Sequence, residues 1–220
     1  MRAFFAAPVS EGARGEIAAY AENLRGSFRI RRGRGRRSFA EGTPKAGAER
    51  SSSRGWVRPE NYHITLRFLG EIEKERASEL SGKVSAAVCE CQTFCISTGS
   101  PFLMRSNRSR SVVALELSPL EPLIVLSERV EQCLRSAGMP KESRSFRPHL
   151  TLARLRNLRG NPLEEASQSS PTANWPISQI VLYESQLGAG GARYTELDSF
   201  PFQPDATPSK DKQGDRYGTK

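Results

Sequence analysis

Hydrophobic and polar residues follow one another along the chain with two different spacings. A spacing of two, or a short apolar run between turn residues, predicts a β-strand. The strands predicted in this way are Arg2 to Val9, Tyr62 to Leu69, Thr93 to Leu103, Ser111 to Leu117, His149 to Leu155, Ile177 to Gln186 and Tyr194 to Phe200. The third and fourth of these are expected to be joined by the basic turn MRSNRSR, and the last two by LGAGGA.

Apolar residues spaced three and four apart predict three helices. Ser10 is a good N-cap for the first, which covers residues 11–25. The second covers residues 71–90, and the third begins at Pro119 and runs to about Ala137, before Gly138. Helices interspersed with strands, some of the strands consecutive, predict an α+β or mixed α/β architecture.

Two segments show neither spacing. Residues 31–54 are rich in Arg, Gly and Ser, and residues 203–220 are polar throughout. Neither segment can bury enough apolar surface to offset the entropy of ordering it. We therefore expect one folded domain over residues 1–202, interrupted by a disordered insertion at 31–54 and followed by a disordered tail at 203–220.

The net charge of +9 would suggest nucleic-acid binding if it were spread over the domain. Most of this charge lies in the insertion, which contains eight Lys and Arg residues and two Glu residues. The rest of the domain is only slightly basic. The insertion could supply sequence-independent affinity for phosphate backbones, so an RNA-binding module is one alternative function.

Both histidines of the chain occur in the same short pattern. PENYHITLRFLG contains His63 and Thr65, and RPHLTLARLR contains His149 and Thr151. By average residue usage, two such repeats arise by chance with a probability on the order of 10⁻⁶. On a strand, residues two apart point to the same face, so each motif presents an imidazole and a hydroxyl together. The repeat hints at two similar lobes that bring both motifs to one cleft.

Two imidazoles fit acid–base catalysis at phosphorus. One takes a proton from the attacking oxygen while the other gives a proton to the leaving oxygen, and an unperturbed pKa near 6.5 suits both tasks. The hydroxyl of each motif can donate to a phosphate oxygen as charge develops. This chemistry needs neither a metal ion nor a cofactor, and we expect neither.

Other kinds of site have weaker support. Two histidines are too few for a closed zinc site. The cysteines (Cys89, Cys91, Cys95 and Cys133) match no disulfide framework and are expected to be reduced and mostly buried. No apolar run is long enough to span a membrane, and the N-terminus resembles a strand more than a signal peptide. We therefore expect a cytoplasmic protein, and nothing in the sequence demands more than a monomer.

The motif residues resemble those of the two-histidine phosphoesterase superfamily, and in particular of the bacterial RNA 2′,3′-cyclic phosphodiesterases, also called 2′-5′ RNA ligase-like proteins. The resemblance extends over MRAFFAAPV, WVRPENYHITLRFLGEI, FRPHLTLARLR and LYESQLGAGGARYTEL. It implies a bilobal α+β fold with a pseudo-twofold axis, two antiparallel-rich sheets, outer helices and an active site between the lobes.

The same resemblance implies hydrolysis of a 2′,3′-cyclic phosphate at an RNA end to a 2′-phosphomonoester. His63 would donate the proton to the 3′ oxygen and His149 would activate water, although residue types alone permit the opposite assignment. Thr65 and Thr151 would bind the phosphate. Some members of the family join tRNA halves through a 2′-5′ linkage at the same site, so a ligase acting on tRNA fragments remains an alternative.

Two arginines follow the motifs and are candidates for substrate binding. Arg67 is four residues after His63, so strand alternation puts it on the same face. Arg154 is five residues after His149, so alternation points it away unless the strand ends or bulges.

Overall fold

The computed structural model describes residues 1–27, 55–107, 110–156, 158, 163, 170–188 and 191–203. The predicted insertion at 31–54 and all but the first residue of the predicted tail lie outside this described part. Gln203, the exception, pairs with Gln92 in an isolated parallel bridge. Among the described residues, no helix has both the length and the apolar character needed to cross a membrane.

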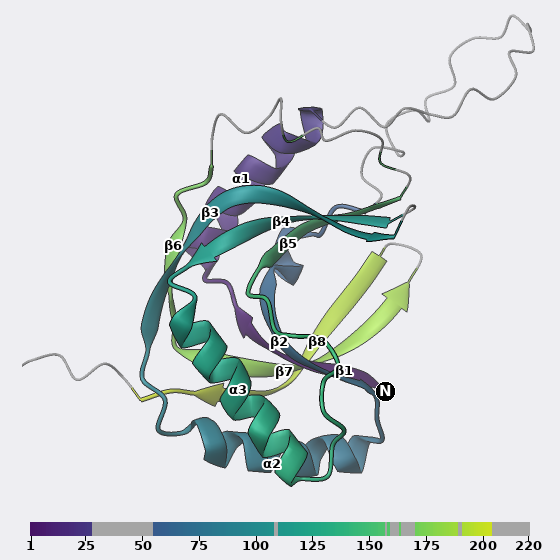
Figure 1. Cartoon of the computed structure of the whole chain (residues 1–220), viewed down its shortest axis with the longest axis vertical. Coiled ribbons are helices and arrows are strands. Elements are labelled where there is room, and N and C mark those ends of the chain that lie inside the picture. The colour runs from purple at the N-terminus through teal and green to yellow at the C-terminus, as the bar shows by residue number, and fades with distance from the viewer. Residues whose placement is uncertain are drawn as a thin grey trace, which may run out of the picture.

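One sheet carries the first histidine motif. Its strands are β1 (Arg2–Pro8), β2 (His63–Glu71), β7 (Gln179–Gly188) and β8 (Gly191–Pro201). They lie in the order β2-β1-β7-β8, with each strand antiparallel to its neighbour. The motif strand β2 is therefore at one edge of this sheet, and the β7–β8 hairpin is at the other (Figure 1).

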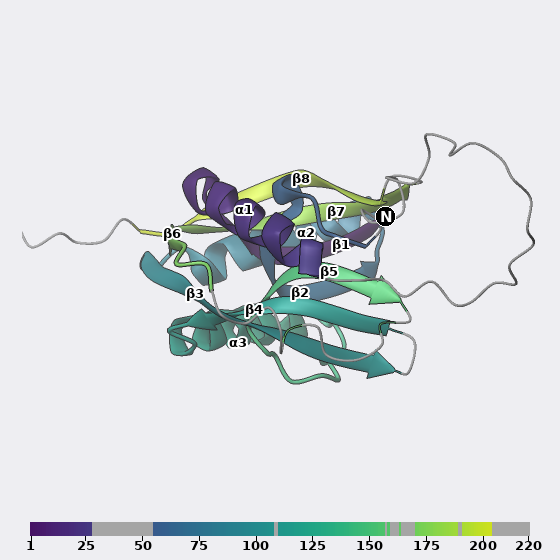
Figure 2. The same ribbon diagram turned by 90° about the horizontal axis from the view of Figure 1, so that it is seen from above.

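The other sheet carries the second motif. Its strands are β3 (Phe94–Asn107), β4 (Arg110–Ser118), β5 (Leu150–Arg156) and β6 (Asn174–Ile177), in the order β5-β4-β3-β6. The first two continue through most of the predicted basic turn, and β6 was not predicted because only four residues, one of them Pro176, form it. Seen from above, β7 and β8 lie in one layer and β3, β4 and β5 in the other (Figure 2).

The three predicted helices are present as α1 (Glu11–Ser27), α2 (Lys74–Val88) and α3 (Glu121–Ser136). Ser10 caps α1 as predicted, since its hydroxyl accepts a hydrogen bond from the backbone N–H of Ala13 (3.4 Å). α2 and α3 pack against each other, and Ser127 of α3 donates to the backbone carbonyl of Leu66 in β2 (3.4 Å). The α+β prediction is confirmed, with two antiparallel sheets and outer helices around one hydrophobic core.

The outer edge of β5 is covered by the segment that precedes the first motif. The backbone N–H of Arg154 donates to the carbonyl of Gly55 (2.6 Å), and that of Val57 donates to the carbonyl of Leu152 (2.8 Å). Gly55 has a φ of 101°, and a β-carbon there would lie 2.4 Å from the carbonyl oxygen of Arg154. The close pairing therefore requires glycine at this position.

Candidate active site

Local backbone geometry fixes the ring of His63. A single turn of 3₁₀ helix, η2 (Pro59–Asn61), leads into β2 and places the carbonyl of Asn61 2.7 Å from Nδ1 of His63. A carbonyl oxygen only accepts, so Nδ1 carries the hydrogen and donates it. In the neutral ring Nε2 is then unprotonated, and it accepts a hydrogen bond from the Thr65 hydroxyl at 2.9 Å. The first His-x-Thr pair is thus joined directly.

The second motif repeats this arrangement. Nδ1 of His149 lies 2.7 Å from the carbonyl of Arg147, two residues earlier in the chain, and donates to it. The neutral ring again has Nε2 unprotonated. Both histidines are half-buried, as are both threonines of the motifs. Each imidazole is therefore oriented by a backbone carbonyl and keeps one basic nitrogen for chemistry.

Both motif strands contain a β-bulge directly after the threonine. In β2, Thr65 pairs with Ala6 and Arg67 with Phe5, so Leu66 is the extra residue. In β5, Thr151 pairs with Ala114, Ala153 with Val113 and Arg154 with Val112, so the extra residue is Leu152. Each bulge reverses the alternation of the residues that follow it.

The bulges decide which arginine reaches the site. Arg67 falls on the face opposite Thr65, so the prediction that it shares the face of His63 is wrong. Arg154 falls on the same face as Thr151, which is the exception that the sequence analysis allowed for. The position in β2 that corresponds to Arg154 is Phe68, which pairs with Phe4.

Arg154 acts on both imidazoles. Burial is the main cause that lowers the pKa of His63, which reaches about 4, and the positive charges of Arg154 and His149 lower it further against the opposing hydrogen bond to Asn61. Burial also lowers the pKa of His149, and again the charge of Arg154 lowers it further. The two histidines and Arg154 therefore form one electrostatic cluster at the contact between β2 and β5.

Arg67 instead ties β2 to α3 and to the segment that leads to His149. Its Nε donates to Glu131 (2.5 Å), its Nη1 to Glu142 (3.3 Å) and to the backbone carbonyl of Phe68, and its Nη2 to the carbonyl of Pro140 (2.6 Å). Only 8% of the side chain is exposed. Its role is to hold these elements together.

We expect Arg67→Met to lower the free energy of unfolding by about 2 kcal/mol. The substitution removes several hydrogen bonds from a buried cation, while Glu131 and Glu142 retain enough exposure to be hydrated. Urea unfolding measures the change. Lys83→Met is the matched control, because the ion pair that the described residues show for Lys83 is an exposed one with Glu79, so its loss should leave the free energy of unfolding nearly unchanged. Equal costs for the two substitutions would contradict the prediction.

Aromatic rings surround His63. The ring centroid of Phe4 lies 5.0 Å from that of His63, that of Tyr194 lies 5.2 Å away in an edge-on arrangement, and that of Tyr183 lies 6.4 Å away. The β7–β8 hairpin that carries the tyrosines is held by Asn61, whose side-chain amide donates to the carbonyl of Ala192 (2.8 Å). Sequence analysis missed these rings, because only the pairing of β1, β2, β7 and β8 brings them together.

The lowered pKa of His63 makes stability depend on pH. Between about pH 6.5 and 4, the unfolded chain binds a proton that the folded protein resists, so the free energy of unfolding falls as the pH falls through this window. We expect His63→Gln to lose less stability than the wild type between pH 7 and pH 5 in urea unfolding. The remaining titrating groups are common to both proteins, so parallel pH curves would contradict the prediction.

The four cysteines are free thiols, and the prediction that they are mostly buried is wrong. Cys89 and Cys95 are exposed, while Cys91 and Cys133 are half-buried. In the part of the chain that the structure describes, no three His, Cys, Asp or Glu residues form a group that could hold a metal ion.

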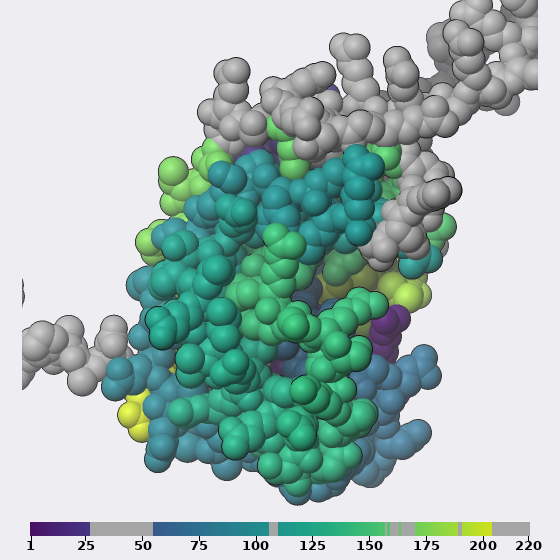
Figure 3. Space-filling model, in the orientation of Figure 1, coloured from purple at the N-terminus to yellow at the C-terminus, as the bar shows by residue number. Residues whose placement is uncertain are grey.

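The space-filling view shows a recess on the side of the molecule where green residues following α3 approach the yellow-green residues of the β7–β8 hairpin (Figure 3).

Comparisons with known proteins show which protein family this chain resembles in sequence. The sequence model of the 2′-5′ RNA ligase superfamily matches residues 38–189. The chain is 35% identical over 153 residues to a Bacillus subtilis protein named RNA 2′,3′-cyclic phosphodiesterase, covering 67% of this chain and 79% of the relative. An Escherichia coli protein of the same name is 32% identical over 146 residues, covering 64% and 76% of the two chains.

Solved structures share the fold. Escherichia coli LigT complexed with 3′-AMP matches with a TM-score of 0.65 and 24% identity, covering 91% of this chain and 97% of that one. A Thermus thermophilus protein, TT0787, matches with a TM-score of 0.66 and 20% identity, covering 93% and 100%. At these identities the likeness supports the architecture of the two sheets.

Proposed function

Because the chain belongs to the 2′-5′ RNA ligase superfamily, we propose that it is an enzyme that hydrolyses RNA 2′,3′-cyclic phosphate ends to 2′-phosphomonoesters by two-histidine acid–base catalysis. A relative that is 35% identical carries the name of this activity. The observation that carries the proposal is geometric: two half-buried imidazoles, each oriented through Nδ1 by a backbone carbonyl, lie on the contacting strands β2 and β5, with Arg154 on the same face of β5 as Thr151. Two oriented rings near one cation suit an anionic phosphate between them.

In the proposed reaction, His149 accepts a proton from water as the water oxygen attacks phosphorus. The bond between phosphorus and the 3′ oxygen breaks, and His63 donates its Nε2 proton to that oxygen. The phosphate stays on the 2′ oxygen. Both histidines have lowered pKa values in the free protein, so His63 needs the bound phosphate anion to favour its protonated form.

The hydroxyls and Arg154 act on the phosphate itself. Thr65 donates to Nε2 of His63 in the free protein, and protonation of Nε2 removes that acceptor. The Thr65 hydroxyl is then available to donate to a non-bridging phosphate oxygen, and Thr151 plays the equivalent part from β5. Arg154 adds a positive charge on the same face. The site needs no cofactor for these steps.

The proposed substrate is an RNA that ends in a 2′,3′-cyclic phosphate. The ligase alternative uses the same residues, with a 5′ hydroxyl of a second RNA in place of water. The alternative of an RNA-binding module rests on the segment 31–54, which is outside the described residues. We expect the phosphodiesterase to be active as a monomer.

The test is turnover of a short RNA that ends in a 2′,3′-cyclic phosphate, in the presence of EDTA. Products are separated as 2′- and 3′-phosphates, and a parallel reaction contains an RNA with a free 5′ hydroxyl. Formation of the 2′-phosphate with EDTA present supports the proposal. Joined RNA as the main product favours the ligase, and an unopened ring in both reactions overturns both activities.

A further inference from the structure

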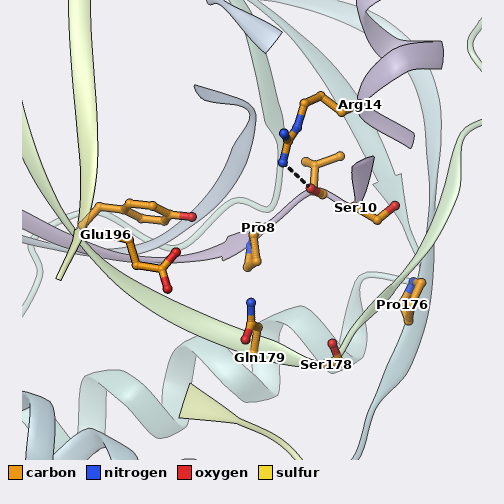
Figure 4. Close-up of a pocket in the computed structure, with 9 residues that line it drawn as sticks. Pro8, Ser10, Arg14, Pro176, Ser178, Gln179 and Glu196 are labelled. Atoms are coloured by element: carbon orange, nitrogen blue, oxygen red, sulfur yellow. Dashed lines mark hydrogen bonds between the residues drawn. The ribbon is translucent and has the colours of Figure 1, made fainter. Parts of the chain in front are cut away.

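A second concave feature lies beside the candidate active site. It is a pocket of about 280 Å³ at the point where β1 ends and α1 begins. Its lining includes Pro8, Ser10, Arg14, Gln179, Tyr183 and Glu196. Arg14 and Glu196 lie on different sides of it (Figure 4). The mechanism proposed above uses none of these residues.

The pocket adjoins His63 on the same face of the sheet. Pro8 is the direct register partner of His63. Tyr183 lines the pocket, and its ring centroid is 6.4 Å from that of His63. Tyr183 also pairs with Glu196 of β8, which brings that carboxylate to the same side. If the two histidines hold the phosphate, the nucleoside that carries this phosphate can therefore reach the pocket.

Opposite charges lie on different sides of the pocket, and the described residues show no ion pair between them. The Nη2 of Arg14 donates to the carbonyl of Val9 (3.2 Å), and its buried Nε has no hydrogen-bond partner among the described residues. Glu196 is exposed and makes no ion pair within the described part of the chain. Burial is the main cause that raises the pKa of Tyr183, the Glu196 carboxylate raises it further, and the Arg14 guanidinium lowers it. Both charges therefore lie close to the tyrosine hydroxyl.

Guanine is the base whose hydrogen-bonding edges match this pair of charges. Its O6 and N7 accept hydrogen bonds from a guanidinium, and its N1–H and N2–H groups donate to a carboxylate. Adenine offers N7 but has an amino donor where guanine has O6. Cytosine donates through its exocyclic amino group alone, where guanine offers the adjacent N1–H and N2–H groups to both carboxylate oxygens, and uracil has only one ring donor. We propose that the pocket binds the guanine base of the terminal nucleotide, so that the enzyme prefers RNA ends with guanosine 2′,3′-cyclic phosphate. This inference rests on the proposed function.

The experiment compares short RNAs that differ only in the terminal base next to the cyclic phosphate. We expect kcat/KM for the guanosine end to exceed that for the uridine end by about tenfold or more. Glu196→Gln and Arg14→Gln should each lower this ratio by about tenfold, since each removes a charged hydrogen-bonding partner. Glu184→Gln is the matched control and should keep the ratio, because Glu184 follows Tyr183 in β7 and so faces the other side.

The outcomes separate this inference from the proposed function. The guanine pocket is overturned if the cyclic phosphate opens at equal rates for all terminal bases, or if both pocket variants keep the wild-type ratio of kcat/KM between the guanosine and uridine ends. Neither outcome contradicts the phosphodiesterase activity. If no RNA is opened, the proposed function fails, and calorimetric binding of 2′-GMP and 2′-UMP decides the pocket. Tighter binding of 2′-GMP that Glu196→Gln abolishes supports it, and equal binding overturns it.

Discussion

His149→Ala and His63→Ala should each lower kcat for opening of the cyclic phosphate by about 10²–10⁴-fold. Each ring is held by a backbone carbonyl at 2.7 Å and supplies one basic nitrogen, which alanine cannot replace. The loss of kcat in the double variant should be much smaller than the product of the two single losses, because the acid and the base act in one step. Steady-state kinetics with a short RNA measure kcat, and single-turnover kinetics show that the loss lies in the chemical step.

Folding has to be checked beside these rates. His149→Ala should keep the circular dichroism spectrum of the wild type, since among the described residues the His149 ring hydrogen-bonds within its own segment, to the carbonyl of Arg147. A variant of either histidine that folds and retains wild-type kcat would contradict the two-histidine mechanism. Effects that multiply in the double variant would mean that the two rings act in separate steps.

Arg154→Met should lower kcat/KM by about 10- to 100-fold, the effect of losing a charged hydrogen-bonding group at a phosphate. It should also raise the pKa of both histidines. The positive charge of Arg154 disfavours the protonated rings, so its removal makes protonation easier. In the pH profile of kcat/KM, which reports the free enzyme, both limbs should move to higher pH.

Arg135→Met is the matched control for this change. Arg135 is an exposed arginine in the last turn of α3, and its loss removes the same net charge. It should leave both the rate and the histidine pKa values unchanged, as followed by NMR titration of the ring protons. If Arg154→Met leaves the titration of His63 and His149 where it was, Arg154 is not part of their cluster.

The sequence was sufficient to predict most of the strands and helices and the two His-x-Thr pairs. These depend on local periodicity and on a repeated motif, which are visible without long-range information. The orientation of the arginines was not predictable, because nothing in ITLRF or LTLAR marks Leu66 or Leu152 as the extra residue of a bulge. The alternation rule therefore placed Arg67 on the face of the site and pointed Arg154 away from it.

The aromatic rings around His63 were not predicted from the sequence for a different reason. Phe4 and Tyr194 are far apart in the chain, and their ring centroids lie 5.0 Å apart because β1 and β8 both neighbour β7. Their proximity depends on strand order, which periodicity does not determine. The same holds for the pocket, whose Arg14 and Glu196 come from α1 and β8.

The pairing of Gly55 and Val57 with β5 has a consequence for solubility. An uncovered edge strand presents unpaired N–H and C=O groups on which another chain can add a strand and begin aggregation. β5 is the edge strand of its sheet, and the backbone of residues 55–57 occupies its outer side at Arg154 and Leu152. This short segment thus protects the second motif strand from edge-to-edge association between molecules.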